Sequence, residues 1–506
     1  MTRSLGYPLR LAVVSLLLLL TWTVAVPLFG SPDEPAHLYK AYGTAHGQAI
    51  GVPIEGLSSN IRRFDVPAEM GLPPNVMCWI FQPSESVGCA LPGATGAGDS
   101  TAAVYPPFWY GVVGGGARVV GQDTSQRTYR AVAATLCALL IAAAFAVAAR
   151  APSRRLSPLL LIGLTPMTLF LAGTVNPNGF EIVGFLLIWA LCLHVDGDAA
   201  PGRRAGVIVG SIAAMLLLSR FASAIWVATG AAVMVLTIGV SGVKRFLNRA
   251  FLVPAVGLTA AASVVLVAWS RYAGAEAEDP RIATDMALAD AARATWERTP
   301  ELLRQMIGVL GWLDTRIPTF SYVAFAVLTA VVLAGVGLAR DRRLAVAALA
   351  VCAGVIVIPI VVNVASAASA GLIWQGRYTL PLFAMLGMLG MLGWQRRLAR
   401  HPDERLLGVV RWTAATCFVV AEVGAFWQCL RRFTVGSGGK VWLTDPLPWQ
   451  PSIAPMPLIA INAVLVTTFA LVVLHGTARP LVGDVPHPGS YDSWPDGETT
   501  AATVDR

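Results

Sequence analysis

Residues 9–29 read LRLAVVSLLLLLTWTVAVPLF, and SPDEPAH follows at residues 31–37. The first stretch is almost unbroken apolar sequence, and a helix of about 20 such residues crosses a hydrocarbon layer of roughly 30 Å. It has no small-residue cleavage site, so we expect a retained span and not a removed signal peptide. The second stretch then sets two acids and a histidine at a membrane surface.

The composition of the whole chain indicates an integral membrane protein. Of its 506 residues, 56% are hydrophobic and only 13% are charged, and the mean hydropathy is +0.64. A soluble globular protein does not carry this much apolar surface. We therefore predict an all-α polytopic membrane protein with about twelve spans. The runs lie at 9–29, 129–149, 156–174, 179–195, 205–219, 221–240, 251–269, 319–339, 343–363, 378–394, 407–427 and 457–475.

The orientation of these spans follows from the basic residues of the short loops, because cytoplasmic loops are enriched in Lys and Arg. With a cytoplasmic N-terminus, every inner loop is basic: Arg150, Arg154 and Arg155; Arg203 and Arg204; Lys244, Arg245 and Arg249; Arg340, Arg342 and Arg343; Arg396, Arg397, Arg400 and Arg405. We predict a multi-pass protein of the cytoplasmic (inner) membrane with both termini inside. The net charge of +8 then reflects orientation and contact with anionic membrane lipids. Its dispersal among the loops argues against a nucleic-acid partner.

The apolar stretch at 104–120 is treated separately. It is short and rich in Gly, and it begins with Pro-Pro and three aromatic residues, which favours a helix in the outer interface over a span. Counting it as a span would invert every later loop and turn the basic loops outward.

This topology divides the chain into a transmembrane domain at 1–475 and a tail at 476–506. The tail is rich in Pro, Gly, Asp and Thr and is predicted to be disordered and cytoplasmic. The large loops, at 30–128, 270–318 and 428–456, all lie outside. They are unevenly distributed and we find no internal repeat, which favours an enzyme over a transporter built from paired halves.

Two of the seven cysteines lie in the first outer loop. Cys78 and Cys89 are eleven positions apart and flanked by Pro and Gly, so in an oxidising exterior we expect a disulfide, with free thiols as the alternative. The loop has no Cys-x-x-Cys spacing, which argues against a zinc site.

The motif at 31–42 carries the candidate chemistry. Ser31, Pro32 and Glu34 form a helix-start signature in which the serine caps free amides and the glutamate reaches back. This interpretation does not explain Asp33 and His37, which stand four residues apart and so share one helix face. A carboxylate at the lip of a lipid-facing cavity can act as a general base, because partial desolvation raises its proton affinity.

Three motifs carry a resemblance to a known family: SPDEPAHLYKAY at 31–42, YPPFWY at 105–110 and WQGRYTLP at 374–381. They resemble a family of bacterial multipass membrane proteins that is itself similar to the C-type (GT-C) glycosyltransferases, which use polyprenyl-phosphate sugars. The resemblance implies a GT-C-like fold with interfacial helices in the first outer loop, one of them at 105–109. It implies that Asp33 is the base, with Glu34 as its catalytic neighbour. The motif residues that we assign to substrate binding are His37, Tyr39, Lys40, Tyr105, Trp109, Trp374, Gln375 and Tyr378.

Two arginines on the outer side are candidates for gripping a phosphate. Arg220 lies in an outer hairpin between spans, and Arg377 lies in the third motif. A guanidinium offers parallel donors to phosphate oxygens as a leaving group gains charge. The alternative is an arginine that only reaches the lipid headgroups.

Secondary candidates lie in the other outer segments. Trp312 and Asp314 follow an apolar helical stripe in the second large loop and could stack on and bond an acceptor sugar; the simpler interpretation is a helix on the membrane surface. Glu181 follows Asn176-Pro-Asn178, for which a capped turn is the simpler account.

These inferences predict an inverting membrane glycosyltransferase. It would transfer a sugar from a polyprenyl-phosphate donor to an envelope glycan, lipid or protein on the outer face. No cofactor is demanded, although acids and phosphate oxygens could share a divalent metal. The alternatives are a transporter or flippase for a lipid-linked envelope precursor and a non-catalytic envelope-assembly protein.

Overall fold

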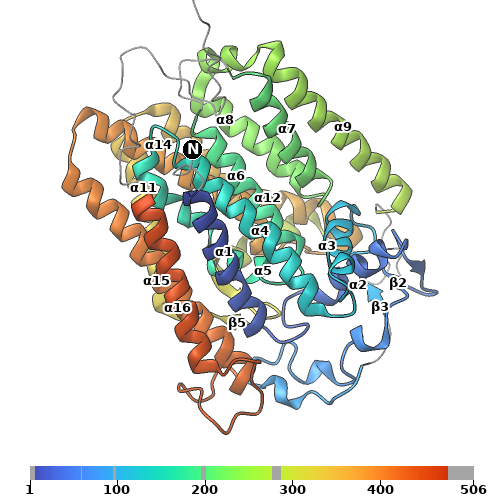
Figure 1. Ribbon diagram of the computed structural model, residues 1–506. Coiled ribbons are helices and arrows are strands. Elements are labelled where there is room, and N and C mark those ends of the chain that lie inside the picture. The colour runs from blue at the N-terminus through green and yellow to red at the C-terminus, as the bar shows by residue number, and fades with distance from the viewer. Residues whose placement is uncertain (1–5, 58–59, 95–97, 195–200, 276–285, 477–506) are drawn as a thin grey trace, which may run out of the picture.

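The computed structural model describes residues 6–57, 60–94, 98–194, 201–275 and 286–476, and it is a bundle of long helices with loops gathered at one end (Figure 1). Eight helices of the described chain are long and apolar enough to cross a membrane. They are α1 (Gly6–Ala25), α4 (Gln126–Ala148), α8 (Ser223–Phe246), α9 (Arg249–Ala273), α11 (Thr319–Leu338), α12 (Arg342–Ala370), α15 (Glu404–Val435) and α16 (Pro455–Gly476). The predicted class, an all-helical polytopic membrane protein, is confirmed.

The predicted number of about twelve spans is not confirmed. Helices η4 (Arg154–Gly163) and α5 (Pro166–Ala172) are bent by 77° and make at most one further, broken span. Three other predicted runs form shorter or interrupted helices, namely α6 (Pro177–Cys192), α7 (Arg203–Leu217), and the series η5 (Gly376–Thr379), α13 (Leu380–Phe383) and α14 (Met385–Arg400). Apolar run length does not reveal where proline ends or bends a helix.

Both ends of the described chain lie at the same end of the bundle, because the Tyr7 ring lies against Gly476. The basic loops meet there as well: Arg155 pairs with Glu404 at 2.5 Å, and the Asn248 amide donates to the Pro201 carbonyl at 3.1 Å. The first large loop and residues 437–454 lie at the opposite end (Figure 1), called the loop end below. The basic loops and large loops therefore segregate as the charge pattern predicts, while which end faces the cytoplasm stays a prediction.

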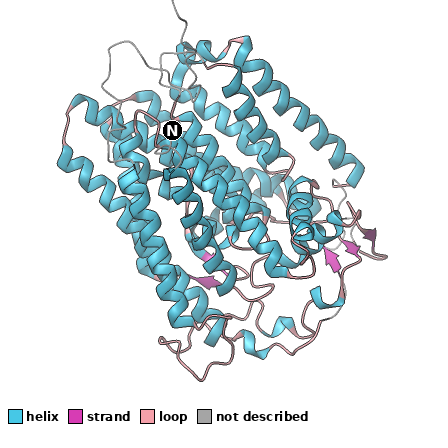
Figure 2. Cartoon of the chain, viewed as in Figure 1, coloured by secondary structure: helices cyan, strands magenta, loops and turns pink. Residues whose placement is uncertain are grey.

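The loop end is built mostly from short elements, together with one 21-residue helix (Figure 2). It contains helices α2 (Glu34–Ala45), α3 (Phe108–Val119) and α10 (Leu288–Gly308), with the short turns η1 (Ala68–Met70), η2 (Val76–Cys78) and η3 (Val87–Cys89). Strands β1 (Val52–Pro53), β2 (Arg62–Phe64) and β3 (Gly98–Ser100) form an antiparallel sheet in that order, and β4 (Val309–Leu310) pairs with β5 (Thr315–Arg316). Helix α3 has only 12 residues and packs on α2 and α4, so it does not count as a span.

A disulfide joins Cys78 and Cys89, as their position predicts. The buried Arg432 of α15 fixes this part of the loop on the bundle. Its guanidinium donates to the carbonyls of Trp79 and Glu85, each at 2.6 Å. The first loop is thus attached to the last long helices of the chain.

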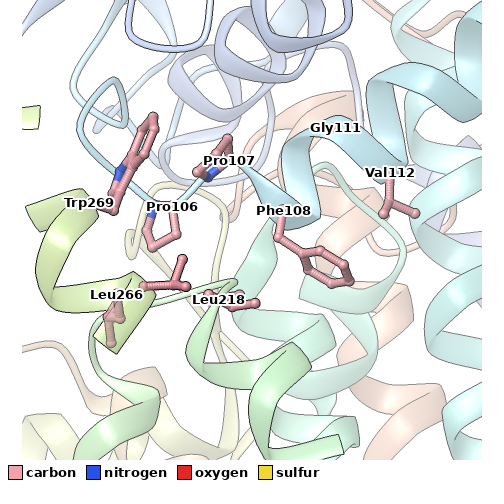
Figure 3. A pocket seen from close by; sticks show the side chains of 9 residues that line it. Pro106, Pro107, Phe108, Gly111, Val112, Leu218, Leu266 and Trp269 are labelled. Atoms are coloured by element: carbon pink, nitrogen blue, oxygen red, sulfur yellow. The ribbon is translucent and has the colours of Figure 1, made fainter. Parts of the chain in front are cut away.

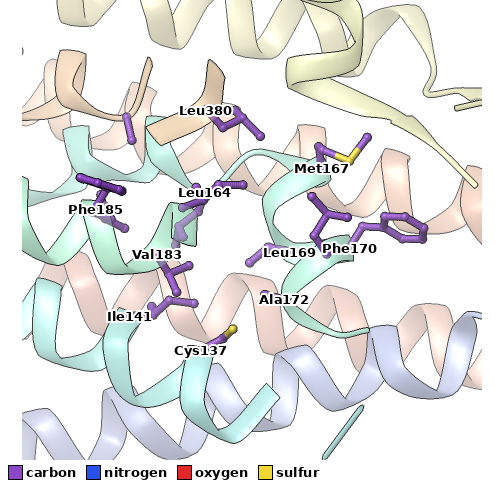
Figure 4. Close-up of a cluster of buried hydrophobic side chains, with 14 of the residues drawn as sticks. Cys137, Ile141, Leu164, Met167, Leu169, Phe170, Ala172, Val183, Phe185 and Leu380 are labelled. Carbon is purple, nitrogen blue, oxygen red and sulfur yellow. The ribbon is translucent and has the colours of Figure 1, made fainter. Parts of the chain in front are cut away.

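The core of the bundle lies where α4, α5 and α6 meet. Buried side chains from the three helices, including Ile141, Phe170 and Phe185, pack together (Figure 4). Helices α4 and α6 each contribute a side chain to the site described below, Arg130 and Glu181. The predicted disordered tail at 477–506 lies outside the described residues.

Candidate functional site

The turn between α1 and α2 presents Asp33. Asp33 is the N-cap of α2, with a left-handed backbone (φ 61°) and no side-chain capping bond. The predicted capping box at Ser31 is wrong, because the Ser31 hydroxyl meets the Thr174 hydroxyl at 3.0 Å. The Asn176 amide donates to the Pro32 carbonyl at 3.0 Å. The segment before α6 therefore holds the turn, and the Asp33 side chain is left to point elsewhere.

Glu34 is fully buried and engaged by Arg130 of α4. The two side chains form a bidentate pair, with both N···O distances at 2.7 Å, and the Val175 amide also donates to Glu34 at 3.1 Å. Arg130 gives its remaining donors to the carbonyls of Thr23, Val26 and Pro27. With both carboxylate oxygens occupied, the geometry gives Glu34 a positioning role for the turn and leaves no oxygen for direct catalysis.

Asp33 pairs with Arg377. One carboxylate oxygen accepts from Nη2 of Arg377, whose side chain is 1% exposed, whereas that of Asp33 is 39% exposed. The Nε and Nη1 atoms of Arg377 are buried and have no hydrogen-bond partner among the described residues. An unpaired buried donor costs roughly 1–3 kcal/mol, and more when it is charged. Arg377 therefore has donors left over among the described residues, and the Asp33 carboxylate can be reached by solvent.

A second acid–arginine pair lies beside the first. Arg220 Nη1 is 3.3 Å from Glu181 at the start of α6 and has no hydrogen-bond partner in the described chain. Glu181 also accepts from the Ser223 hydroxyl at 2.6 Å. Both guanidinium groups lie over the Tyr378 ring, with centroid distances of 5.1 Å for Arg220 and 5.3 Å for Arg377. Tyr378 thus brings two cations to one place.

His37 and two tyrosines form a third side of the site. Nδ1 of His37 is 2.9 Å from the Tyr110 hydroxyl, and the His37 ring lies 6.1 Å from that of Tyr105. Tyr105 in turn packs edge-on against Phe221, the residue after Arg220. Asp33 and His37 share one helix face, as predicted, and both lie at the group formed by Arg220 and Arg377, which we call the arginine cluster.

The electrostatics of the site keep its groups in defined charge states. Burial opposes ionisation of Asp33, but Arg377, His37 and Arg220 together outweigh it and lower the pKa of the carboxyl below its ordinary value. Burial lowers the pKa of His37 to about 3, and the two arginines act in the same direction while Asp33 opposes them. Burial raises the pKa of Tyr105 to about 12. At neutral pH the site holds a carboxylate, a neutral imidazole and neutral phenols.

An apolar cavity adjoins this cluster. It has a volume of about 380 Å³ and lies between α3, α7 and α9 (Figure 3). Pro106, next to Tyr105, forms part of its wall, and Leu218, two residues before Arg220, forms another part. The Trp269 indole donates to the Val104 carbonyl at 2.8 Å and holds the wall in place. The cavity wall and the polar cluster therefore share the chain segments 105–106 and 218–220.

Residues 16–386 match the DUF2142 family, described as a predicted membrane protein. The chain belongs to this family. The matched stretch contains all three motifs and ends before α15. No curated protein matches the chain.

Two crystal structures of ArnT from Cupriavidus metallidurans are similar to this chain. One holds undecaprenyl phosphate; it is 16% identical, with a TM-score of 0.45 over 93% of this chain and 77% of that chain. The other is the apo state; it is 14% identical, with a TM-score of 0.46 over 93% of this chain and 76% of that chain. No activity follows from a likeness at this level.

Several predicted substrate-binding residues of this family member serve other contacts. Tyr39 and Trp109 are almost fully buried, and Lys40 donates to the carbonyls of Ala49 and Ala103, which ties two parts of the first loop together. The Trp374 indole donates to Thr379 at 3.0 Å while its ring packs on Tyr378. Gln375 has a buried amide oxygen with no partner in the described residues. Of these, Trp374 supports the site through Tyr378.

Of the secondary candidates, one lies at the site and two make other contacts. Glu181 belongs to the cluster. The Trp312 indole donates to the Phe29 carbonyl at 2.9 Å, and Asp314 is held by Arg432 at 3.0 Å and by Thr315 at 2.7 Å. The indole N–H of Trp312 and the carboxylate of Asp314 are therefore engaged within the chain, and contact of either residue with an acceptor stays a prediction.

Three contributing residues were missed from the sequence. Tyr110 lay in a quoted motif, and its partnership with His37 had no signal in the spacing. Arg130 was counted as part of an apolar run, although an arginine within a predicted span is itself a signal that it has a partner. Ser223, three residues after Arg220, had no distinguishing pattern.

The donor set does not fit a divalent metal. No group of three or more His, Cys, Asp or Glu side chains able to hold a metal ion occurs in the described ranges. Each acid of the site is already engaged by an arginine. The chemistry considered below therefore uses guanidinium groups to balance the phosphate charge and the Asp33 carboxylate to take a proton.

Proposed function

We propose that this protein is a GT-C-like membrane glycosyltransferase that uses a polyprenyl-phosphate sugar and an envelope acceptor at the extracytoplasmic face. The observation that carries the proposal is the Asp33–Arg377 pair, in which a partly exposed carboxylate stands beside buried guanidinium donors that have no partner among the described residues. Such donors favour an anionic ligand with several oxygens, and phosphate is the ligand that a guanidinium matches best.

Donor binding would divide between two environments. The phosphate would lie at Arg220 and Arg377 over Tyr378, and the first isoprene units would enter the apolar cavity beside Leu218. Burial of each CH₂ group contributes about 0.8 kcal/mol. Apolar burial would supply affinity, and the two arginines would select the phosphate headgroup.

Sugar transfer would then be a single displacement with inversion. The acceptor hydroxyl oxygen attacks the anomeric carbon while Asp33 takes its proton. The bond between that carbon and the phosphate oxygen breaks, and the electron pair leaves with the polyprenyl phosphate. The two guanidinium groups stabilise the charge that develops on the leaving oxygen, and Asp33 ends protonated.

The arrangement also gives Arg377 a second task. While Arg377 holds Asp33, the carboxylate has a low pKa and is a weak base. A phosphate that takes over Arg377 would release Asp33 and raise its proton affinity. The base would thus become competent only when the donor is in place.

A transporter or flippase of a lipid-linked precursor is the second candidate, and one observation favours it. Glu422 in α15 is 1% exposed, and both of its oxygens lack hydrogen-bond partners among the described residues. A buried ionisable residue within a span is a common feature of transport pathways. The proposed enzyme has no use for Glu422, so this residue separates the two functions.

The decisive experiment compares transfer by membranes that contain wild type, Asp33→Asn or Glu422→Gln, each supplied with a panel of radiolabelled polyprenyl-phosphate sugars. Loss of a general base lowers the rate by about 10²–10⁴-fold, so Asp33→Asn should be inactive at normal protein level. Glu422→Gln should retain transfer. The matched control is Asp65→Asn, an exposed acid of the same loop, which should behave as wild type. Normal transfer by Asp33→Asn excludes the assigned base, and loss of lipid translocation in Glu422→Gln alone would favour the transporter.

A further inference from the structure

A second cavity, which is polar, lies at the loop end beside the β4–β5 hairpin. It has a volume of about 510 Å³, and we call it the hairpin pocket. Residues from four separate segments line it, among them Pro83, Glu301, Leu313, Arg316, Gln428 and Ser437. None of these residues belongs to the arginine cluster.

Gln428 is an amide side chain that lines the pocket. It is 8% exposed. An amide carries two donors and one acceptor, so Gln428 can bond an occupant of the pocket through all three. Asp314, also at the pocket, is engaged by Arg432 and Thr315, so Gln428 is the buried side chain that we assign to binding.

The other polar groups favour a neutral ligand. Glu301 and Arg316 pair at 2.8 Å, with side chains 32% and 63% exposed. Opposite charges held at one rim do not select an anion or a cation, but they offer acceptors and donors together. A molecule with many hydroxyl groups uses both, since each hydroxyl donates and accepts.

The pocket also has an aromatic neighbour. Phe81, two residues before Pro83, is 56% exposed and packs edge-on against Trp312 at 5.5 Å. Ligand pockets commonly combine such apolar surface with a few placed polar groups. The apolar face of a sugar ring fits this combination.

The hairpin is bonded to the turn that presents the base. The Trp312 indole donates to the Phe29 carbonyl at 2.9 Å, four residues before Asp33. An occupant of the hairpin pocket would therefore contact the element that adjoins the proposed catalytic turn.

We propose that the hairpin pocket is a binding subsite for a saccharide, the acceptor glycan of the transfer reaction. This inference rests on the proposed function and names its acceptor class. Gln428 would bond ring hydroxyls inside the pocket, Glu301 and Arg316 would bond those at the rim, and Phe81 would cover an apolar sugar face.

The test uses the purified full chain in detergent on an array of immobilised oligosaccharides from bacterial envelopes, including mannans, arabinans, galactans and peptidoglycan fragments. Wild type should bind at least one class. Gln428→Leu, which keeps the side-chain volume, and Arg316→Ala, at an exposed position that tolerates change, should each weaken that binding at least about tenfold, as expected for a lost bond to a buried amide or a charge. Gln122→Leu, at an exposed glutamine of the same end, is the matched control and should bind normally.

The outcomes separate this inference from the proposed function. If wild type binds none of the oligosaccharides, or if both pocket variants bind as wild type does, the subsite is excluded even where transfer is intact. If glycan binding needs Gln428 and Arg316 but no polyprenyl-phosphate sugar is ever used, the subsite stands and the proposed donor fails.

Discussion

Two neighbouring acids, Asp33 and Glu34, each pair with an arginine, and the two pairs differ in almost every other respect. The Glu34–Arg130 pair has side chains 0% and 1% exposed, with both carboxylate oxygens bonded and the remaining guanidinium donors on carbonyls. The Asp33–Arg377 pair has a carboxylate 39% exposed and an arginine with two unpartnered nitrogens among the described residues. In the first pair every hydrogen-bonding group has a partner, and in the second pair two nitrogens of the arginine have none among the described residues.

The comparison teaches how to separate a structural ion pair from a binding one. A buried pair whose groups are all satisfied fixes the chain, and removing one partner leaves an uncompensated charge. A pair with spare donors and an exposed partner can exchange that partner for a ligand at little cost. The sequence motif does not distinguish the two acids, whereas their partners do.

The largest expected effect is on the complete pair. Arg130→Met should lower the free energy of unfolding by about 3–5 kcal/mol, because it leaves the Glu34 carboxylate buried and unpaired. Arg377→Met should cost less, since water can reach Asp33. The free energy of unfolding of both variants can be measured in detergent, where the mobility of the folded protein gives the folded fraction. Equal losses would mean that the two pairs do not differ as described.

A smaller effect is expected at the Asp33–Arg377 pair, where removal of the Asp33 charge should raise the affinity for a phosphate ligand. Asp33→Asn should bind undecaprenyl phosphate about 3–10-fold more tightly than wild type, because a charged competitor for Arg377 is removed at a partly exposed site where the bond is weaker than a buried one. Arg377→Lys should bind it more weakly. Native mass spectrometry in detergent can rank the three proteins. Weaker binding by Asp33→Asn would show that the carboxylate assists the phosphate and does not compete with it.

A third effect concerns the dependence of stability on pH. His37 has a folded-state pKa of about 3, whereas an unfolded histidine has a pKa of about 6.5. Below pH 6.5 the unfolded chain therefore takes up a proton that the folded site refuses, and stability falls as the pH falls towards 3.

Between pH 7.5 and pH 5 this contribution is about 1–2 kcal/mol. His37→Gln should flatten the dependence of the melting temperature on pH over this range. His401→Gln, at an exposed position, should leave the dependence unchanged. An unaltered slope in His37→Gln would mean that the imidazole is not held neutral by its surroundings.

The sequence predicted the helical membrane class, the disulfide and the separation of basic loops from large loops, because hydropathy and charge are local properties. It did not predict the bend between η4 and α5, since apolar length hides a break at Gly163–Pro166. It placed Asp33 and His37 on one face and named Asp33 as the base, but it also listed Glu34 as a catalytic neighbour. Their roles depend on Arg377 and Arg130, which lie 344 and 96 residues away along the chain. No local pattern carries such long-range pairing.

The left-handed backbone at Asp33 also restricts which residues can stand there. For residues with a Cβ atom this region is costly, and Asn and Asp are the usual exceptions to the preference for glycine. Glutamate would bring the same functional group, but it would meet the steric penalty and place its carboxylate one methylene further from the turn. The backbone conformation and the chemistry of the side chain therefore both favour aspartate at position 33. A longer acid at this position would require a different turn between α1 and α2.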